Sequence, residues 1–202
     1  MPWSIYQLKP AFQRLLRPLV GALARAGVTP NALTVGTAAA VVAYGAALAA
    51  WPSCRGLWLG LVGVMPVRMA LNALDGLLAR HTGRITPLGA VLNEVCDLGA
   101  DLALTLPVAR LAGVEPVLAV AVAAGAALVE QVGLAALAAG QARRFDGPMG
   151  KSDRAFAYGL VGLLAGLGVD PRWIDGVLAA TGLLLVATFV NRLRAGVRPP
   201  TP

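Results

Sequence analysis

Long apolar runs alternate with short polar connections along most of this chain. Six runs are near the ~20 residues that an α-helix needs to cross the ~30 Å hydrocarbon layer of a membrane. The predicted spans cover residues 32–51, 56–79, 88–110, 114–139, 155–170 and 173–192. Turn-forming Gly, Pro and Asp residues fill the connections between them. The pattern predicts an all-α integral membrane protein with six transmembrane helices, built as one domain over residues 1–202.

The segment before the first span, residues 1–27, has a different pattern. Its apolar residues recur at helical spacing at Phe12, Leu15, Leu16, Leu19, Val20 and Leu23. Gln13, Arg14 and Arg17 face elsewhere, which is typical of an amphipathic helix lying in the membrane interface. Pro18 predicts a bend. This helix is expected to be either a simple anchor or a roof over a site at the membrane surface.

The composition agrees with a membrane protein. Hydrophobic residues make up 57% of the chain and charged residues only 13%, with a mean hydropathy of +0.71. Soluble domains carry about 25% charged residues. The first residues show no short apolar core followed by a cleavage site, so no cleaved signal peptide is expected. Cys54 falls in a predicted connection and Cys96 inside a span, and we expect both to be unpaired.

Basic residues gather on alternate connections and orient the spans. Most of the 17 Lys and Arg residues lie in the N-terminal segment, the second and fourth connections and the tail. The other connections contribute only Arg55, Arg110 and Arg172. The positive-inside rule therefore predicts cytoplasmic termini, and the richness in Ala, Gly and Leu favours a bacterial inner membrane. The net charge of +7 indicates topology and attraction to anionic lipid, and no nucleic-acid partner is expected.

Polar side chains line one face of two successive spans. At about 100° per residue, the faces comprise Arg68, Asn72 and Asp75 on the second span and Asn93, Asp97 and Asp101 on the third. Facing carboxylates repel unless a cation lies between them, and an ionisable residue inside a bilayer needs a partner. Hard oxygen ligands suit Mg²⁺ or Mn²⁺. The pattern predicts a divalent-metal site, with pairing of Arg68 to Asp101 or Glu130 as a purely structural alternative.

The two polar stretches form one motif. Starting at Asn72, the sequence reads N-x-x-D-G-x-x-A-R, then eight residues, then G-x-x-x-N-x-x-x-D. It resembles the signature of the CDP-alcohol phosphatidyltransferase family, which has Asp where this chain has Asn72 and Asn93. Six of the eight defining places match, namely Asp75, Gly76, Ala79, Arg80, Gly89 and Asp97. The T-P-N-x-x-T stretch from Thr29 to Thr34 and the GPMGKSDRA stretch before the fifth span extend the resemblance.

The resemblance implies a reaction and a cofactor. Family members transfer a phosphatidyl group from a CDP-linked lipid, usually CDP-diacylglycerol, to the hydroxyl of a small alcohol, and they release CMP in phospholipid biosynthesis. Mg²⁺ or Mn²⁺, as two ions, is expected on the CDP diphosphate. The expected ligands are Asn72, Asp75, Asn93 and Asp97, with Asp101 one turn beyond as a further ligand. Amide oxygens carry no charge, so this set should hold metal more weakly than four carboxylates.

The resemblance also implies roles for other residues. Asp97 is the expected general base for the acceptor hydroxyl. The residues expected to contact the CDP group are Thr34, Gly76, Ala79, Arg80 and Gly89. A homodimer is implied as well, and the G-x-x-x-G patterns at Gly56–Gly60 and Gly162–Gly166 offer small faces for helix contact.

Four basic residues around the start of the fifth span are candidates for an acceptor site: Arg143, Arg144, Lys151 and Arg154. Phosphate favours cationic donors, so this group indicates a phosphorylated alcohol such as glycerol phosphate or inositol phosphate. The alternative is that these residues serve only the positive-inside rule. Two other functions stay open: an inactive relative that only binds lipid, and a small transporter that uses ionisable residues inside its spans.

Overall fold

The computed structural model describes the backbone of residues 9–197 and the side chains from Arg14 onward. Regular structure within this range is helical throughout, which confirms the all-α class. The elements are α1 (Lys9–Arg25), α2 (Pro30–Ala50), α3 (Arg55–Thr82), α4 (Pro87–Thr105), the short 3₁₀-helix η2 (Leu106–Arg110), α5 (Pro116–Ala138), α6 (Lys151–Leu167) and α7 (Pro171–Gly196). Residues 1–8 of the predicted interfacial segment and the tail after Val197 lie outside the described residues.

Threonine-proline pairs begin the two helices that enter the predicted site. The Thr29 side chain accepts a hydrogen bond from the Ala32 amide at 3.2 Å and caps α2. Thr86 caps α4 in the same way, through the Gly89 amide at 3.0 Å. Each threonine is followed by a proline, whose missing N–H costs nothing in the first turn of a helix. These short local signals fix where α2 and α4 begin.

Within residues 9–197, four helices are long and apolar enough to cross a membrane: α2, α3, α5 and α7. The third and fifth predicted spans correspond to α4 and α6, which are not among these four. Helix α4 carries Glu94, Asp97 and Asp101 within its 19 residues, and α6 has only 17 residues. The third span also differs from the prediction because its α-helix ends at Thr105, and η2 continues it around Pro107.

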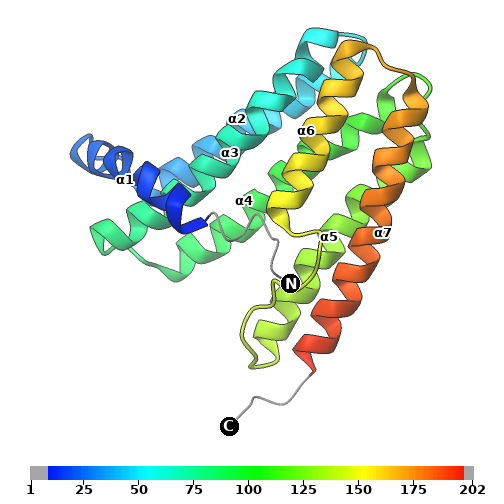
Figure 1. Cartoon of the computed structure of the whole chain (residues 1–202). Helices are drawn as coiled ribbons and strands as arrows, with labels where there is room; N and C mark the ends of the chain where they lie inside the picture. The colour runs from blue at the N-terminus through cyan, green and yellow to red at the C-terminus, as the bar shows by residue number, and fades with distance from the viewer. Residues whose placement is uncertain (1–8, 198–202) are drawn as a thin grey trace.

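The helices run up and down in a bundle (Figure 1), in which α3 packs mainly against α6, α5 against α7 and α2 against α4. The core contains fully buried Trp58, Leu61 and Leu104. Small residues allow the closest approaches. A Cβ on Gly162 would lie 2.7 Å from the carbonyl oxygen of Trp58. This face of α6 is therefore buried against α3 within the chain, although the sequence suggested it as a dimer contact.

Helix α1 crosses the end of α3 with one apolar face inward. Leu16 and Val20 pack against Leu74 and Leu78 of α3. On the opposite side Leu15 is 73% exposed. Helix α1 therefore has apolar residues both against α3 and away from the bundle, and its position in the membrane interface stays a prediction. Contact with α3 brings α1 close to the helix that carries Asn72 and Asp75.

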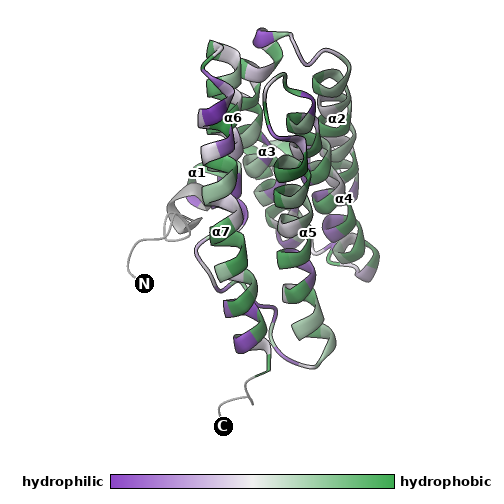
Figure 2. Cartoon of the chain, turned by 90° about the vertical axis from the view of Figure 1, so that its right-hand side faces the viewer, coloured by the Kyte–Doolittle hydropathy of each residue, from purple (hydrophilic) through white to green (hydrophobic). Residues whose placement is uncertain are grey.

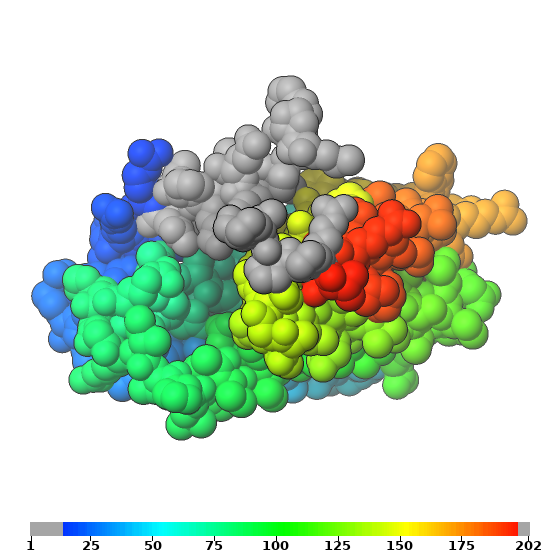
Figure 3. All heavy atoms as spheres, turned by 90° about the horizontal axis from the view of Figure 1, so that it is seen from below, coloured from blue at the N-terminus to red at the C-terminus, as the bar shows by residue number. Residues whose placement is uncertain are grey.

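The connections that are rich in basic residues lie at one end of the bundle. Viewed from that end, α1, the turn between α3 and α4, the loop between α5 and α6 and the end of α7 share one face (Figure 3). Figure 2 shows apolar stretches along α5 and α7, and charged residues lie near both ends of α7. An alternating up-and-down course therefore places the basic connections together.

Candidate functional site

Two pairs of polar side chains connect α3 and α4. The Asn72 amide donates a hydrogen bond to Oδ1 of Asp97, and the Asn93 amide donates to Oδ2 of Asp75 at 3.2 Å. The predicted polar faces of the second and third spans therefore meet, and each asparagine bridges to the aspartate of the other helix. We call these four residues the polar quartet.

Asp75 is the most enclosed member of the polar quartet, with 5% of its surface exposed. The Thr34 hydroxyl of α2 donates a hydrogen bond to its Oδ2 at 2.7 Å, and the Gly76 amide donates to its Oδ1 at 2.6 Å. The sequence grouped Thr34 with the CDP-binding residues. Its hydroxyl instead lies on Asp75, so α2 contributes directly to the surroundings of this carboxylate.

Asp97 is bound on both of its carboxylate oxygens. The Lys151 ammonium, at the first residue of α6, pairs with Oδ2, while Asn72 occupies Oδ1. Arg68 donates to the backbone carbonyl of Asp97 at 2.9 Å. The sequence placed Lys151 in an acceptor site, and its position beside the predicted general base is compatible with that role. Each carboxylate oxygen therefore already accepts one hydrogen bond from a side chain.

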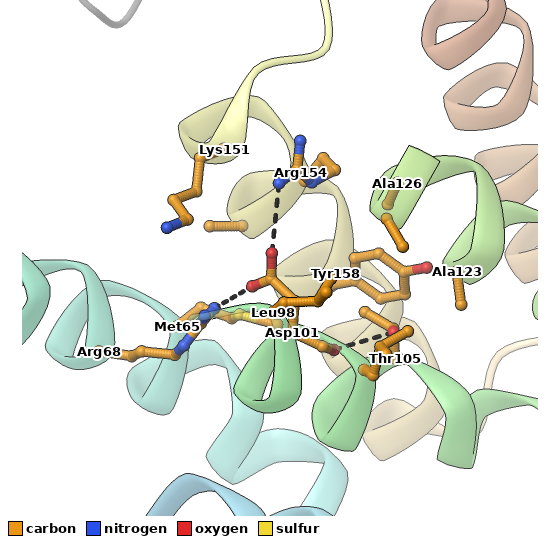
Figure 4. Close-up of a pocket in the computed structure, with 13 residues that line it drawn as sticks. Met65, Arg68, Leu98, Asp101, Thr105, Ala123, Ala126, Lys151, Arg154 and Tyr158 are labelled. Carbon is orange, nitrogen blue, oxygen red and sulfur yellow. Dashed lines mark hydrogen bonds and ion pairs between the residues drawn. The ribbon is translucent and has the colours of Figure 1, made fainter. Parts of the chain in front are cut away.

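Asp101 pairs with two arginines. Arg68 of α3 binds its Oδ1, and Arg154 of α6 approaches its Oδ2 at 3.2 Å (Figure 4). Both arginines are only 4% exposed. The structural alternative to metal binding, a pair between Arg68 and Asp101, is therefore present. Both carboxylate oxygens of Asp101 are held by guanidinium groups, which makes this residue the weakest candidate among the predicted metal ligands.

A second ionic group surrounds Glu130 of α5. Arg143, Arg154 and Arg192 all approach its carboxylate. Arg143 also forms a two-point pair with Glu94 of α4. Burial, and then the neighbouring Arg192 guanidinium, lower the pKa of Arg143. Sequence reasoning missed Arg192 as a site residue, although a charged residue at the end of an apolar span was an available signal.

Arg144 differs from the other three basic residues predicted for the acceptor site. It forms no ion pair with an acidic side chain of residues 14–197, and its buried Nε has no hydrogen-bond partner there, a feature that it shares with Arg143. Arg143, Lys151 and Arg154 each have at least one carboxylate partner. Arg143, Lys151 and Arg154 therefore come together at α4, where each pairs with an acidic side chain.

The small residues of the motif lie at the basic end of the bundle. A Cβ on Gly76 would meet only the Arg80 guanidinium, at 3.7 Å, so this position is open. A Cβ on Gly89 would lie 2.9 Å from Oδ1 of Asn31, so a larger residue there would require the Asn31 side chain of α2 to shift. Ala79 is half-buried and Arg80 is exposed. Gly76, Ala79 and Arg80 therefore leave an accessible surface beside Asp75.

The polar quartet offers oxygen donors of the kind that divalent cations prefer. Within residues 9–197, no group of three or more His, Cys, Asp or Glu side chains could hold a metal ion. Two of the four motif positions are asparagines, which are not among these residue types, so the polar quartet contains only two carboxylates. The Asn72 and Asn93 amides donate to the two carboxylates, and the Lys151 ammonium supplies positive charge at Asp97.

A cavity opens beside Asp97. It is lined by polar side chains from α4, α5, α6 and the loop before α6, among them Glu94, Asp97, Asp101, Glu130, Arg143 and Lys151. A small molecule bound there would lie next to the predicted general base. The cavity is therefore the best candidate for the position of an acceptor.

Comparisons with known proteins agree with this architecture. The chain is 40% identical to the inner membrane protein YnbA of Escherichia coli over 197 residues, which cover 95% of this chain and 96% of that protein. It is 32% identical to a phosphatidylinositol phosphate synthase of Corynebacterium glutamicum over 204 residues, covering 98% and 90% of the two chains. The curated relatives include an archaetidylinositol phosphate synthase of Aeropyrum pernix, 29% identical over 93% of each chain.

Solved structures share the fold. The phosphatidylinositol phosphate synthase of Mycobacterium tuberculosis with CDP-DAG bound superposes with a TM-score of 0.74 at 22% identity, covering 94% of this chain and all of that one. The family description of CDP-alcohol phosphatidyltransferase matches residues 27–190, a range that includes the polar quartet and the residues around it. This multi-pass membrane protein belongs to the CDP-alcohol phosphatidyltransferase family.

Proposed function

We propose that this protein transfers a phosphatidyl group from CDP-diacylglycerol to the hydroxyl of a small alcohol and releases CMP. The observation that carries the proposal is the polar quartet, which joins α3 and α4 at the motif positions of the family. A structural relative binds CDP-DAG in one structure and manganese with citrate in another. The acyl chains would stay in the lipid, while the head group enters from the basic end of the bundle.

In this proposal Asp97 is the general base. Its carboxylate borders the cavity in which an alcohol would bind, and a base must reach the hydroxyl whose proton it accepts. The positively charged ammonium group of Lys151 lies against the same carboxylate. The alcohol hydroxyl would replace the ammonium on Oδ2 and donate its proton there. Lys151 would then be free to face the phosphoryl oxygens.

Mg²⁺ or Mn²⁺ would be held by Asp75 and Asp97, with the amide oxygens of Asn72 and Asn93 turned inward. When bound, such an ion polarises the phosphoryl group and stabilises its developing charge. The quartet has two formal negative charges, so a second ion depends on the CDP diphosphate for its ligands. Asp101 contributes to neither ion, because it holds Arg68 and Arg154.

Replacing Asn72 or Asn93 by Asp should raise metal affinity and lower the stability of the metal-free protein. Each change puts a second carboxylate against an aspartate that the amide now bridges. A charge about 4 Å from a cation interacts by roughly 4 kcal/mol at an effective dielectric of about 20, before desolvation is subtracted. Thermal melting against Mn²⁺ concentration measures both effects without turnover.

The control for these variants is Asn191→Asp, which adds the same charge at an exposed position of α7. It should melt like the parent protein at every metal concentration. If the Mn²⁺ concentration at half-saturation were the same in Asn72→Asp and Asn93→Asp as in the parent protein, neither asparagine would contact the metal. The site would then reduce to the two aspartates.

We also propose six membrane spans with both termini and the loop between α5 and α6 in the cytoplasm. The gathering of basic connections at one end supports this orientation. Helices α4 and α6 would cross with their charged residues turned into the bundle. The homodimer implied by the family stays a prediction, and its contact surface would have to differ from the Gly162–Gly166 face.

Cysteine labelling in intact cells tests the orientation. Gly147 is unsuitable for substitution, because its φ is +124° and a Cβ there would lie 2.6 Å from Thr188. Ala142 is exposed in the same loop. A Cys54→Ser/Ala142→Cys variant should resist a membrane-impermeant thiol reagent, whereas the parent with exposed Cys54 should react. Labelling at position 142 without lysis would invert the proposed topology.

The function itself is tested with purified protein and CDP-diacylglycerol. Release of CMP should require Mg²⁺ or Mn²⁺ and a small alcohol, and it should stop when EDTA is added. The panel of acceptors should include glycerol, inositol, serine and ethanolamine together with phosphorylated counterparts. Binding of the CDP-lipid without CMP release under any of these conditions would identify an inactive relative instead.

A further inference from the structure

Glu130 occupies the centre of a group of three arginines. Its Oε1 lies 2.9 Å from Arg154 and 3.4 Å from Arg192, and its Oε2 lies 3.5 Å from Arg143. Arg154 is 4% exposed and Arg192 is 2% exposed, so both guanidiniums are held inside the bundle. Three guanidiniums converging on one point form a strong site for an anion. In this chain the carboxylate of Glu130, on α5, occupies the place of that anion.

The remaining carboxylates complete the neutralisation of this group. Arg143 is also paired with Glu94, and Arg154 is also paired with Asp101. Each of these two arginines therefore contacts two carboxylates, while Arg192 contacts Glu130 and the backbone carbonyl of Val129. Little positive charge is left over to attract a further anion. This is the opposite of an open phosphate pocket.

The cavity beside Asp97 has the same character. Its lining contains four carboxylates, from Glu94, Asp97, Asp101 and Glu130, but only two cationic groups, from Arg143 and Lys151. Each of these carboxylates already pairs with an arginine or lysine of this chain, so an incoming phosphate would have to compete with them for its cationic partners. A hydroxyl group needs no cationic partner.

Glu130 borders this cavity, and its Oε1 is buried between Arg154 and Arg192 at 2.9 Å and 3.4 Å. Its carboxylate therefore occupies the place between the guanidiniums that the phosphate of a substrate would need.

We propose that Glu130 fills the anion site of this protein and thereby selects a small alcohol that carries no phosphate as the acceptor. This assignment rests on the proposed transfer reaction and identifies its acceptor class. It replaces the phosphorylated alcohol that the basic sequence stretch suggested. The specificity is built in as an internal carboxylate that competes with the phosphate of an unwanted substrate.

The unmodified protein provides the first test. CMP release should be at least roughly tenfold faster with glycerol or inositol than with glycerol phosphate or inositol phosphate at the same concentration. Equal or faster release with the phosphorylated alcohols would overturn the assignment of Glu130. This comparison needs no variant, so it remains decisive if a substitution prevents folding.

A Glu130→Gln variant provides the second test. Removing the carboxylate should create a vacant anion site, so inorganic phosphate should raise its melting temperature, with sodium chloride of equal ionic strength as reference. The unmodified protein should show little response. Glu115→Gln makes the same charge change at an exposed position and should also show little response. The variant should gain turnover with phosphorylated alcohols.

The phosphate measurement is independent of catalysis. Stabilisation of Glu130→Gln alone supports the filled anion site even when no acceptor yields CMP, a result that would overturn the transfer reaction only. Equal stabilisation of the unmodified protein and Glu130→Gln by phosphate would show that the site is open to anions with Glu130 in place. The proposal would then be wrong, whatever the outcome of the transfer assay.

Discussion

Replacing Asp97 by Asn should lower turnover by about 10²–10⁴-fold, the usual contribution of a general base. The substitution keeps the shape of the side chain, and its one amide oxygen can still accept a hydrogen bond from either Asn72 or Lys151, which now donate to different oxygens of Asp97. Folding and binding of the CDP-lipid should therefore survive. Rates of CMP release under saturating metal, together with melting temperature, separate catalysis from stability.

Asp146→Asn is the matched control for this change. Asp146 is an exposed carboxylate in the loop between α5 and α6, outside the polar quartet. Its substitution should leave turnover within about twofold, since surface changes away from a site have small effects. Asp97→Asn with nearly unchanged turnover would remove Asp97 from the role of base. The acceptor proton would then have to go to another group of the cavity.

Replacing Asp101 by Asn should have the largest effect on stability, a loss of about 3–5 kcal/mol in the free energy of unfolding. Its carboxylate is the shared partner of Arg68 and Arg154, which are both 4% exposed. Without it, buried guanidinium charge loses its compensation. Unfolding of the purified protein in EDTA measures this loss in the absence of metal.

The double variant Arg68→Met/Asp101→Leu tests whether the loss comes from the pair. It should be destabilised by less than the sum of the two single changes, because the second change removes the stranded charge. Metal-free stability within about 0.5 kcal/mol of the parent in Asp101→Asn would contradict the structural role. If Asp101→Asn changed the Mn²⁺ concentration at half-saturation but lost no stability in EDTA, Asp101 would instead be a metal ligand.

Much of the fold could be predicted from the sequence because its signals are local. Apolar runs set the helices, and the Thr-Pro pairs at Thr29 and Thr86 set two of their beginnings. Polar residues at helical spacing predicted which faces of α3 and α4 would meet. Contacts of the polar quartet follow that prediction, since Asn72 reaches Asp97 and Asn93 reaches Asp75.

The pairing of charges could not be predicted, because it depends on packing between helices that are distant in the sequence. Arg192 lies 63 residues beyond Val129, the residue whose carbonyl it binds. It reaches Glu130 only because α7 packs along α5. Periodicity places a residue on a face but does not say which helix covers that face. For the same reason the G-x-x-x-G pattern at Gly162 predicted a helix contact without identifying α3 as its partner.

The most direct test of the account is to quantify CMP and the new phospholipid in one reaction of purified protein with CDP-diacylglycerol, Mg²⁺ or Mn²⁺ and a non-phosphorylated small alcohol. Equal amounts of the two products, formed only with divalent metal and strongly reduced in Asp97→Asn, are the expected result. CMP without a matching phospholipid would indicate hydrolysis. Absence of CMP with every acceptor, while the folded protein still binds the CDP-lipid, would contradict the proposed transfer.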